Sequence, residues 1–347
     1  MSLSFALIGA GNIAKVQIEA IKHIPGARVA VICNRTEATG RALAETCGAD
    51  WTADSAAAVS RDDVDIVSIC TPSGAHLEAA VLAAEAGKHL IVEKPLEITL
   101  KRIDQIIEAA QTNGVKLTCF FPNRFMSGVR KAKEAVEAGR LGQLVFADAF
   151  VRWYRDQAYY DVGWRGTWAL DGGGALMNQS IHSIDLLQWL AGPVKSIYAR
   201  TTTLNHDIET EDTAAALLEF TQGGMGNIQG STSCWPGDPA KIELHGTKGT
   251  IVLEEGRITS WQLADAKEGE EAAMVGLEQS SGSGSADPMG ISYENHRQQM
   301  LDMIDAIEND REPLIPGKEA RKAVEIILAI YESARESQAV MLEHAGS

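Results

Sequence analysis

The first third of the chain alternates short apolar runs with segments of helical pattern. The opening run, Leu3 to Ile8, leads directly into Gly9-Ala10-Gly11-Asn12-Ile13-Ala14, and a helix follows to about Ile24. Apolar strands that are each separated by a helix indicate a parallel sheet covered on both faces. The expected strands are residues 3–8, 29–33, 64–70, 90–92 and 115–121, and the further helices are residues 37–47, 74–86 and 100–112.

The glycines of the opening turn follow the pattern G-x-G-x-x-A. The first glycine allows a tight turn, the second lets a pyrophosphate approach the backbone, and the small last residue lets helix and strand pack closely. Because the motif lies between a strand and a helix, it favours dinucleotide binding over a bare turn. We therefore predict that Gly9, Gly11, Asn12 and Ile13 bind a cofactor.

The end of the second strand bears on which dinucleotide binds. NAD enzymes usually carry Asp or Glu there for the ribose hydroxyls, whereas this chain has Asn34 and Arg35. Asn34 removes the repulsion that a 2′-phosphate would feel, and Arg35 offers it a guanidinium fork. NADP is slightly favoured, although an Arg35 beside the adenine is compatible with NAD.

The second half of the chain has a different pattern and indicates a second domain. With 347 residues the chain suggests two domains, which we place at residues 1–122 and 123–347. The second is expected to be an α+β domain with a large open, mainly antiparallel sheet, whose free face is a substrate wall or an oligomer interface. Its expected strands are residues 145–151, 197–203, 214–220, 225–232, 241–245 and 250–253. Two helices, residues 293–308 and 318–335, are expected to close the chain. The first carries an apolar stripe that is typical of a core helix, Met300, Met303, Ile304 and Ile307. Residues 278–287 are expected to form a low-complexity loop.

A polar stripe follows the glycines of Asp171-Gly-Gly-Gly. With Asp171 as N-cap, a largely buried helix would place Asn178, His182, Asp185 and Trp189 on one face. The glycines would let a ligand approach the first backbone N–H groups. A structural His182–Asp185 pair is an equally good interpretation of this stripe alone.

Charge and cysteine content exclude several classes of protein. The net charge of -16 argues against nucleic acid or an anionic membrane as partner. The five cysteines are scattered, and no histidine has metal-ligand spacing, so we expect reduced thiols and no metal. No signal peptide and no apolar run of bilayer length are visible, so a cytoplasmic location is expected.

Residues 152–168 combine six aromatic side chains with three arginines. Aromatic faces stack on sugar C–H faces, and arginine forks bind carboxylate or phosphate. We therefore expect Tyr160, Trp164 and Arg165 to contact substrate. A packed subdomain edge or an oligomer contact is the alternative.

Three motifs in this order resemble the glucose–fructose oxidoreductase and inositol dehydrogenase (Gfo/Idh/MocA) family: the glycine motif, Glu93-Lys94-Pro95, and the three glycines followed by Asn178 and His182. The resemblance covers essentially the whole chain. It implies an N-terminal Rossmann domain, a C-terminal open-sheet domain, a nicotinamide cofactor between them, and catalytic Lys94 and His182. Most of the family has Asp at the position of Asn178; a subset similar to nucleotide-sugar-uronate 3-dehydrogenases has Asn, and this chain resembles that subset most. Asn123 and Arg124 also resemble a family position near substrate.

The chemistry agrees with this resemblance. Hydride transfer from a secondary alcohol needs a base for the hydroxyl proton, and Asn178 cannot accept one, so the proton goes to His182 or Lys94. Lys94 at the carboxyl end of a strand points into the ligand crevice of such a sheet. Further cofactor contacts are expected from Thr71, Pro72, His76 and Glu93, although Glu93 bracing its turn and His76 on a helix face are equal alternatives. Asp185 is a weaker candidate for holding the His182 ring.

The sequence therefore predicts an NAD(P)-dependent dehydrogenase acting on a hydroxyl of a sugar or sugar derivative, with a uronate or a nucleotide sugar at C3 as one option. An inositol or simple aldose dehydrogenase and a non-catalytic cofactor-binding regulator are the alternatives. Pairing through the open sheet predicts a homo-oligomer, a dimer or a tetramer.

Overall fold

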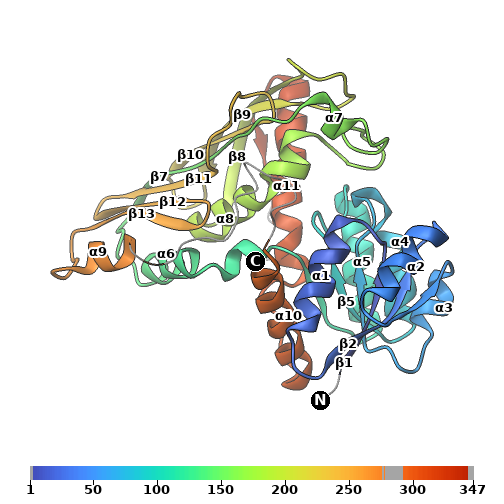
Figure 1. Ribbon diagram of the computed structural model, residues 1–347. Coiled ribbons are helices and arrows are strands. Elements are labelled where there is room, and N and C mark those ends of the chain that lie inside the picture. The colour runs from blue at the N-terminus through green and yellow to red at the C-terminus, as the bar shows by residue number, and fades with distance from the viewer. Residues whose placement is uncertain (1–2, 276, 278–291, 343–347) are drawn as a thin grey trace. The chain divides into compact units, whose positions relative to one another are not determined.

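A computed structural model describes residues 3–275, 277 and 292–342. The chain divides into two compact units, Met1–Pro122 with Ser292–Arg321, and Asn123–Ile291 with Lys322–Ser347 (Figure 1). The first boundary lies where the sequence places it. The prediction that residues 123–347 all belong to the second domain is wrong, because residues 292–321 belong to the first unit.

The first unit is built on a six-stranded sheet of order β3-β2-β1-β4-β5-β6, in which every pair is parallel. This order is that of a dinucleotide-binding Rossmann sheet. Its strands are β1 (Leu3–Ile8), β2 (Ala27–Cys33), β3 (Asp50–Thr52), β4 (Ile66–Ile69), β5 (His89–Val92) and β6 (Leu117–Cys119). Its helices are α1 (Asn12–Lys22), α2 (Glu37–Glu45), α3 (Ser55–Val59), η1 (Ser73–Ala75), α4 (Leu77–Glu85), α5 (Leu100–Thr112) and α10 (Tyr293–Glu308).

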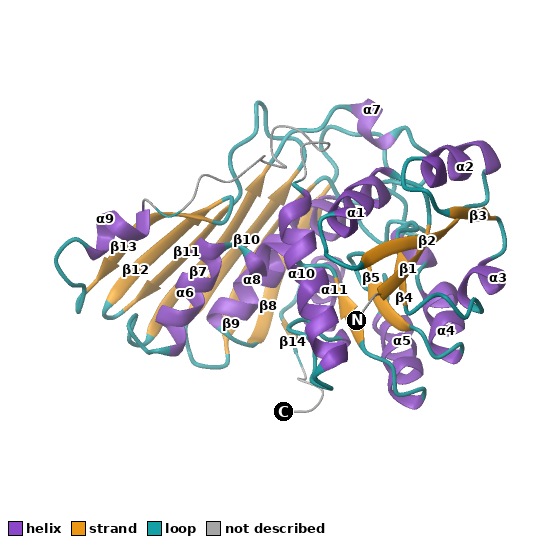
Figure 2. Cartoon of the chain, turned by 60° about the horizontal axis from the view of Figure 1, so that its bottom comes forward, coloured by secondary structure: helices purple, strands orange, loops and turns teal. Residues whose placement is uncertain are grey.

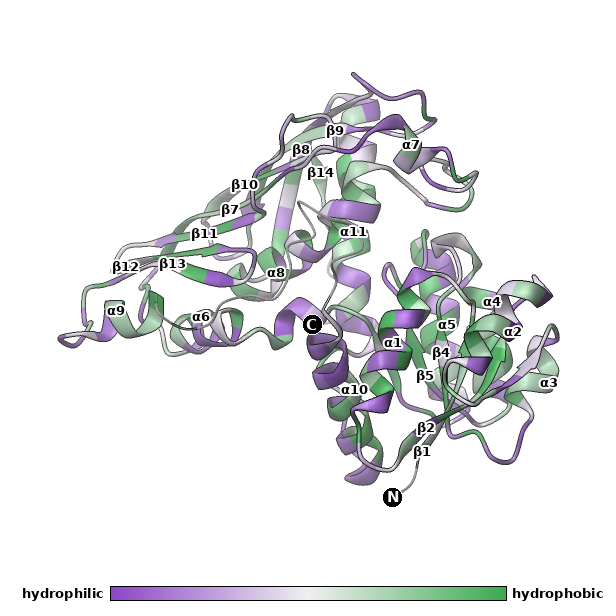
Figure 3. Cartoon of the chain, in the orientation of Figure 1, coloured by the Kyte–Doolittle hydropathy of each residue, from purple (hydrophilic) through white to green (hydrophobic). Residues whose placement is uncertain are grey.

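The core of the first unit explains why a segment from the far end of the chain belongs to it. Strand β1 is buried at all six positions, as expected for a parallel sheet covered on both faces. Met300 and Met303 of α10 lie fully buried in the same cluster as Ile18 and Ile21 of α1. The predicted core stripe is therefore confirmed, and α10, which carries it, lies beside α1 (Figure 3).

The second unit is built on an eight-stranded sheet of order β13-β12-β11-β7-β10-β9-β8-β14. It is antiparallel except for the pair β7 and β10. Its strands are β7 (Leu144–Arg152), β8 (Val194–Thr202), β9 (Thr213–Phe220), β10 (Met225–Ser231), β11 (Lys241–Gly246), β12 (Gly249–Glu254), β13 (Arg257–Leu263) and β14 (Val340–Met341). Its helical elements are η2 (Pro122–Phe125), α6 (Ser127–Glu137), α7 (Gln157–Tyr160), η3 (Ala175–Ser180), α8 (Ile181–Ala191), α9 (Glu270–Val275) and α11 (Gly317–Glu336), of which η2 and α11 begin in the first unit.

Helices cover one face of this sheet, and the other face is open (Figure 2). Side chains alternate accordingly along β9: Ala216 and Leu218 are buried, whereas Leu217 between them is 51% exposed. The open, mainly antiparallel sheet that the sequence predicts is thus confirmed. Residues 278–287, the expected low-complexity loop, lie outside the described residues. Among the residues that are described, no helix has the length and apolar character needed to cross a membrane.

Candidate active site

The glycine turn between β1 and α1 has the geometry of a dinucleotide site. Gly9 has φ +109°, and a Cβ added to it would lie 2.6 Å from the carbonyl oxygen of Cys70, so only glycine fits there. A Cβ added to Gly11 would meet no atom within 4 Å. The backbone at Gly11 is therefore open to a pyrophosphate at the start of α1, where the first N–H groups point outward.

Glu93 braces the turn that carries Lys94. Its Oε1 accepts a 2.6 Å hydrogen bond from Nε2 of Gln17, whose own Oε1 accepts one of 2.5 Å from the hydroxyl of Ser68. Burial raises the pKa of Glu93 to about 7, against the lowering effect of the Gln17 hydrogen bond. The buried carboxyl group makes the contacts that a bracing role requires, and its contact with the cofactor stays a prediction.

His76 has a different role from the expected cofactor contact. Its ring is fully buried, with Nε2 3.0 Å from the carbonyl oxygen of Thr71 and Nδ1 3.0 Å from that of Pro95. Burial lowers the pKa of the imidazole. The side chain ties the turn after β4 to the segment that follows Lys94, and it is not exposed to a ligand.

The Arg35 side chain is exposed, and among the described residues it has no hydrogen-bond or ion-pair partner. Beside it, Nδ2 of Asn34 donates a 2.9 Å hydrogen bond to the carbonyl oxygen of Thr36. Both residues follow directly on β2, at the carboxyl end of the parallel sheet, which is where a ribose is recognised in this fold.

In the second unit, Glu211 binds the backbone N–H groups after the three glycines, where the sequence predicts a ligand. Its carboxylate accepts hydrogen bonds from the backbone N–H of Gly174, at 3.0 Å, and of Leu176, at 2.8 Å, and from the hydroxyl of Tyr331, at 3.0 Å. Cβ atoms added to Gly173 and Gly174 would lie 2.1 Å from the Tyr331 hydroxyl and 1.8 Å from the Glu211 carbonyl oxygen. The glycines therefore make room for the chain itself, and the expectation of a ligand on these N–H groups is corrected.

The helix that follows differs from the expected one in how it begins. Residues Ala175–Ser180 form a π-helix whose N-cap is Gly174, and α8 continues from Ile181. The prediction of Asp171 as N-cap is wrong, since its carboxylate accepts from the N–H of Gly166, at 2.9 Å, and from Nδ2 of Asn178, at 2.7 Å. Short π-helical segments occur frequently at functional sites. This one carries Asn178, one turn before the half-buried His182.

Arg124 is a structural residue. Its guanidinium is 0% exposed and forms two hydrogen bonds with the carboxylate of Asp185, of 2.8 and 2.6 Å, and it lies 4.9 Å from the ring centre of Trp189. The expectation that Arg124 contacts substrate is therefore wrong, because the side chain is enclosed. The neighbouring Asn123 is half-buried. Asp185 is held by Arg124, and its proposed hold on His182 stays a prediction.

The aromatic segment separates into packed and accessible parts. Tyr160 is buried, its hydroxyl 2.7 Å from Oγ1 of Thr232, so the expected substrate contact of this side chain is corrected. Trp164 and Arg165 are half-buried. The guanidinium of Arg165 stacks 3.9 Å from the ring centre of Tyr159.

Sequence reasoning missed Tyr159, Gln179 and Glu211, which hold the helix with Asn178 and His182. The hydroxyl of Tyr159 donates to Oδ1 of Asn178 over 3.2 Å and accepts from Nε2 of Gln179. The aromatic clustering around Tyr159 was a usable signal. Glu211 lies 35 residues beyond Leu176, and no local pattern connects the two.

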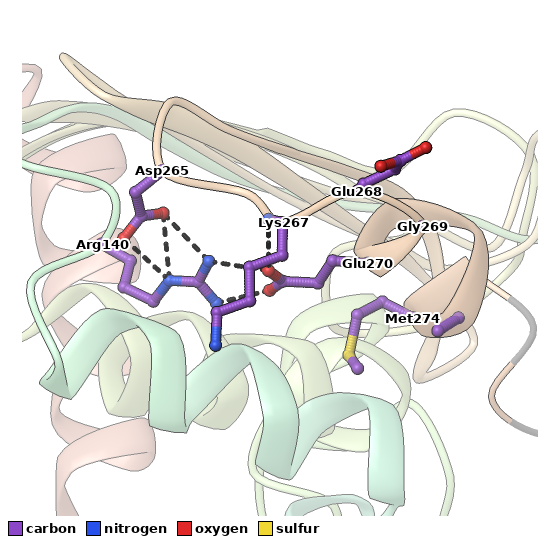
Figure 4. Close-up of a pocket in the computed structure, with 8 residues that line it drawn as sticks. Arg140, Asp265, Lys267, Glu268, Gly269, Glu270 and Met274 are labelled. Carbon is purple, nitrogen blue, oxygen red and sulfur yellow. Dashed lines mark hydrogen bonds and ion pairs between the residues drawn. The ribbon is translucent and has the colours of Figure 1, made fainter.

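The pocket of about 580 Å³ in Figure 4 lies elsewhere in the second unit, where β13 leads into α9. The guanidinium of Arg140 lies between the carboxylates of Asp265, at 2.9 Å, and Glu270, at 2.6 Å. The two carboxylates neutralise the charge of the Arg140 guanidinium. None of the predicted site residues lines this pocket. Across the described part of the chain, no cluster of three or more acidic, histidine or cysteine side chains is able to hold a metal ion.

Comparison with known proteins agrees with this geometry. The family model described as oxidoreductase family, NAD-binding Rossmann fold, matches residues 3–121, and the GFO/IDH/MocA C-terminal domain matches residues 129–252. The WlbA dehydrogenase from Bordetella pertussis, solved with NADH and UDP-GlcNAcA, is 32% identical, with a TM-score of 0.88 over 99% of both chains. The myo-inositol 2-dehydrogenase of Thermotoga maritima is 26% identical over 98% of this chain and 99% of its own. A levoglucosan dehydrogenase solved with NADH shares the fold, with a TM-score of 0.87 at 23% identity over 99% of this chain and 100% of its own.

Proposed function

The chain belongs to the GFO/IDH/MocA oxidoreductase family, and we propose that it transfers a hydride between a nicotinamide cofactor and a secondary hydroxyl of a sugar derivative. The arrangement of Asn178 and His182 carries this proposal. Asn178 donates through Nδ2 to Asp171 and accepts through Oδ1 from Tyr159. An amide held in this way can orient a substrate, but it does not accept a proton at neutral pH. The proton of the substrate hydroxyl must therefore go to another group.

We assign the remaining roles to the two residues of the linked motifs. His182 takes the hydroxyl proton as the alcohol is oxidised and returns it in the reverse reaction. The Glu93 and His76 contacts hold the backbone at Lys94 and Pro95, and we assign to the Lys94 ammonium the stabilisation of charge on the reacting oxygen. When bound, the nicotinamide ring accepts or donates the hydride. Gly9 and Gly11 shape the turn that fits its pyrophosphate.

A nucleotide-sugar uronate, oxidised at C3, is the substrate class that we favour. Arg165 and the half-buried Trp164 offer a guanidinium and an aromatic face, and the WlbA relative was solved with UDP-GlcNAcA. An inositol or simple aldose is the second candidate, favoured by the myo-inositol 2-dehydrogenase relative. A non-catalytic regulator would not need Lys94 and His182, both of which are present.

For the cofactor we propose a preference for NADP that rests on Arg35. The exposed guanidinium, beside an uncharged Asn34, suits a 2′-phosphate. The WlbA and levoglucosan dehydrogenases were solved with NADH, so the two cofactors must be compared directly.

The experiment is a spectrophotometric screen of NAD⁺ and NADP⁺ reduction over UDP-sugars, uronates, inositols and aldoses. We expect turnover with a nucleotide-sugar uronate, and we expect His182→Ala and Lys94→Ala each to lower kcat by about 10²–10⁴-fold with cofactor binding retained. Absence of turnover with every sugar and inositol, or near-normal turnover in either variant, contradicts the assignment.

We also propose that two copies pair through the open sheet face. Phe146 faces Met225 across β7 and β10, and Leu217 faces Tyr198 across β9 and β8, with 38 to 51% of each side chain exposed. An apolar face of this kind is typical of an interface between copies. Light scattering should show a dimer or tetramer that Leu217→Lys weakens, and a wild-type monomer contradicts the proposal.

A further inference from the structure

A chain of hydrogen bonds with a single direction runs through the second unit from Arg155 to Asp171. Nη2 of Arg155 donates to Oε1 of Gln179 over 3.1 Å, and Nε2 of Gln179 donates to the hydroxyl of Tyr159. That hydroxyl donates to Oδ1 of Asn178 over 3.2 Å, and Nδ2 of Asn178 donates to Oδ1 of Asp171 over 2.7 Å. Every link therefore points from the guanidinium toward the carboxylate.

The two ends fix this direction. A guanidinium only donates hydrogen bonds and a carboxylate only accepts them. Reversing the Gln179 amide would place its NH₂ group against the Arg155 guanidinium, and reversing the Asn178 amide would place its oxygen against the Asp171 carboxylate. Asp171 is 1% exposed, and its second oxygen accepts from the N–H of Gly166 over 2.9 Å. The orientation of the Asn178 amide is thus assigned by its neighbours, as amide orientations must be.

We propose that Asp171 is a positioning residue, whose buried carboxylate orients the amide of Asn178 beside the catalytic His182. The proposal rests on the proposed function, in which Asn178 orients the substrate and His182 takes its proton. In this role Asp171 acts on the reaction through Asn178 and does not itself react. The same carboxylate holds the Gly166 turn, so one side chain sets both the helix and the aromatic segment that we assign to substrate binding.

The single substitutions each break the chain in a defined way. In Asp171→Asn, the new amide meets two donors with only one acceptor. If its oxygen accepts from the Gly166 N–H, its NH₂ group faces the NH₂ group of Asn178. If its oxygen accepts from Asn178, its NH₂ group faces the Gly166 N–H. In Asn178→Asp, two carboxyl groups meet at hydrogen-bond distance, and one of them must take up a proton. We expect each variant to lower kcat by about 10- to 100-fold and the thermal midpoint by about 3–10 °C.

The exchange variant Asp171→Asn/Asn178→Asp restores a complete chain. The amide introduced at position 171 then accepts from the Gly166 N–H and donates to the carboxylate introduced at position 178. That carboxylate accepts from Tyr159 and from Nε2 of Gln179, which in the wild type also donates to Oδ1 of Asn178 over 2.9 Å. We expect its kcat and its thermal midpoint to recover most of what either single variant loses. Asp161→Asn, at an exposed carboxylate outside the chain of bonds, is the matched control.

Two readouts separate this proposal from the proposed function. Recovery of the thermal midpoint in the exchange variant needs no substrate, so it tests the Asp171–Asn178 pairing even if no sugar is turned over. Recovery of kcat, with the cofactor dissociation constant unchanged throughout, tests the positioning role. An exchange variant no better than the single ones, or an Asp171→Asn variant with wild-type kcat, overturns the proposal.

Discussion

Glu211→Gln should change how the stability of the second unit depends on pH. Burial raises the pKa of Glu211 from an ordinary 4.5 to about 7, and the hydrogen bonds from Leu176, Tyr331 and Gly174 do not fully offset it. Between these two pH values the folded state binds a proton that the unfolded state has lost, so stability falls as the pH rises. The stabilisation is complete below pH 4.5 and is lost as the pH passes about 7.

The size of the effect follows from the two pKa values. Each tenfold change in a proton equilibrium is worth about 1.4 kcal/mol, which gives about 3 kcal/mol in total for Glu211 and about 2–3 kcal/mol of it between pH 5 and 8. Glutamine has the shape of the protonated acid and does not titrate. The difference in unfolding free energy, Glu211→Gln minus wild type, should therefore rise by about 2–3 kcal/mol over this interval.

Urea unfolding followed by tryptophan fluorescence is the assay, because six of the seven tryptophans lie in the second unit, at positions 153, 164, 168, 189, 235 and 261. Glu93, which also titrates near pH 7, contributes equally to both proteins and cancels in the difference. Glu209→Gln, at an exposed side chain two residues earlier, controls for the loss of one charge. A difference that stays constant from pH 5 to 8 refutes the reasoning.

Further predictions concern the ion pair and the cofactor. Arg124→Met should lower the unfolding free energy by about 3–5 kcal/mol, because it leaves the buried carboxylate of Asp185 without its ion-pair partner. Arg124→Met/Asp185→Leu, which removes both charges, should be close to wild type. An unchanged unfolding free energy together with a raised KM would instead indicate that Arg124 contacts the substrate. Arg35→Ala should weaken NADP(H) binding by about 1.5–3 kcal/mol and leave NAD(H) binding nearly unchanged in calorimetry, and Asn34→Asp should shift the preference the same way. Equal weakening of both cofactors by Arg35→Ala would mean that the guanidinium stacks on the adenine and that the enzyme uses NAD.

The sequence predicts the first unit better than the second because its signals are local. The period of apolar strands and helices and the spacing of Gly9 and Gly11 lie within single βα units, and the structure confirms both. The contacts that decide the roles of Arg124, Asp171 and Glu211 join residues 61, 7 and 35 positions apart. Nothing in the local pattern shows whether a buried polar group meets a ligand or a distant part of its own chain.

In each unit a buried carboxyl group holds the segment that carries a proposed site residue, so more than one group can shape the dependence of kcat on pH. Glu93 braces the turn that carries Lys94, and Glu211 holds the start of the helix that carries His182; burial raises the pKa of each to about 7. Histidine side chains also titrate close to neutrality in general. An ionisation near pH 7 in the profile of kcat against pH therefore has three possible sources, and activity alone does not assign it to the base.

Glu93→Gln and Glu211→Gln separate these sources. Each variant removes one titrating carboxyl group without touching the reacting atoms, so an ionisation that belongs to His182 should persist near the same pH in both, even where kcat itself falls. Loss of the ionisation in Glu93→Gln would show instead that the protonation of this brace, and hence the position of Lys94, limits the rate near neutral pH. The dissociation constant of the cofactor, measured across the same pH range, distinguishes that result from a change in cofactor binding at the neighbouring glycine turn.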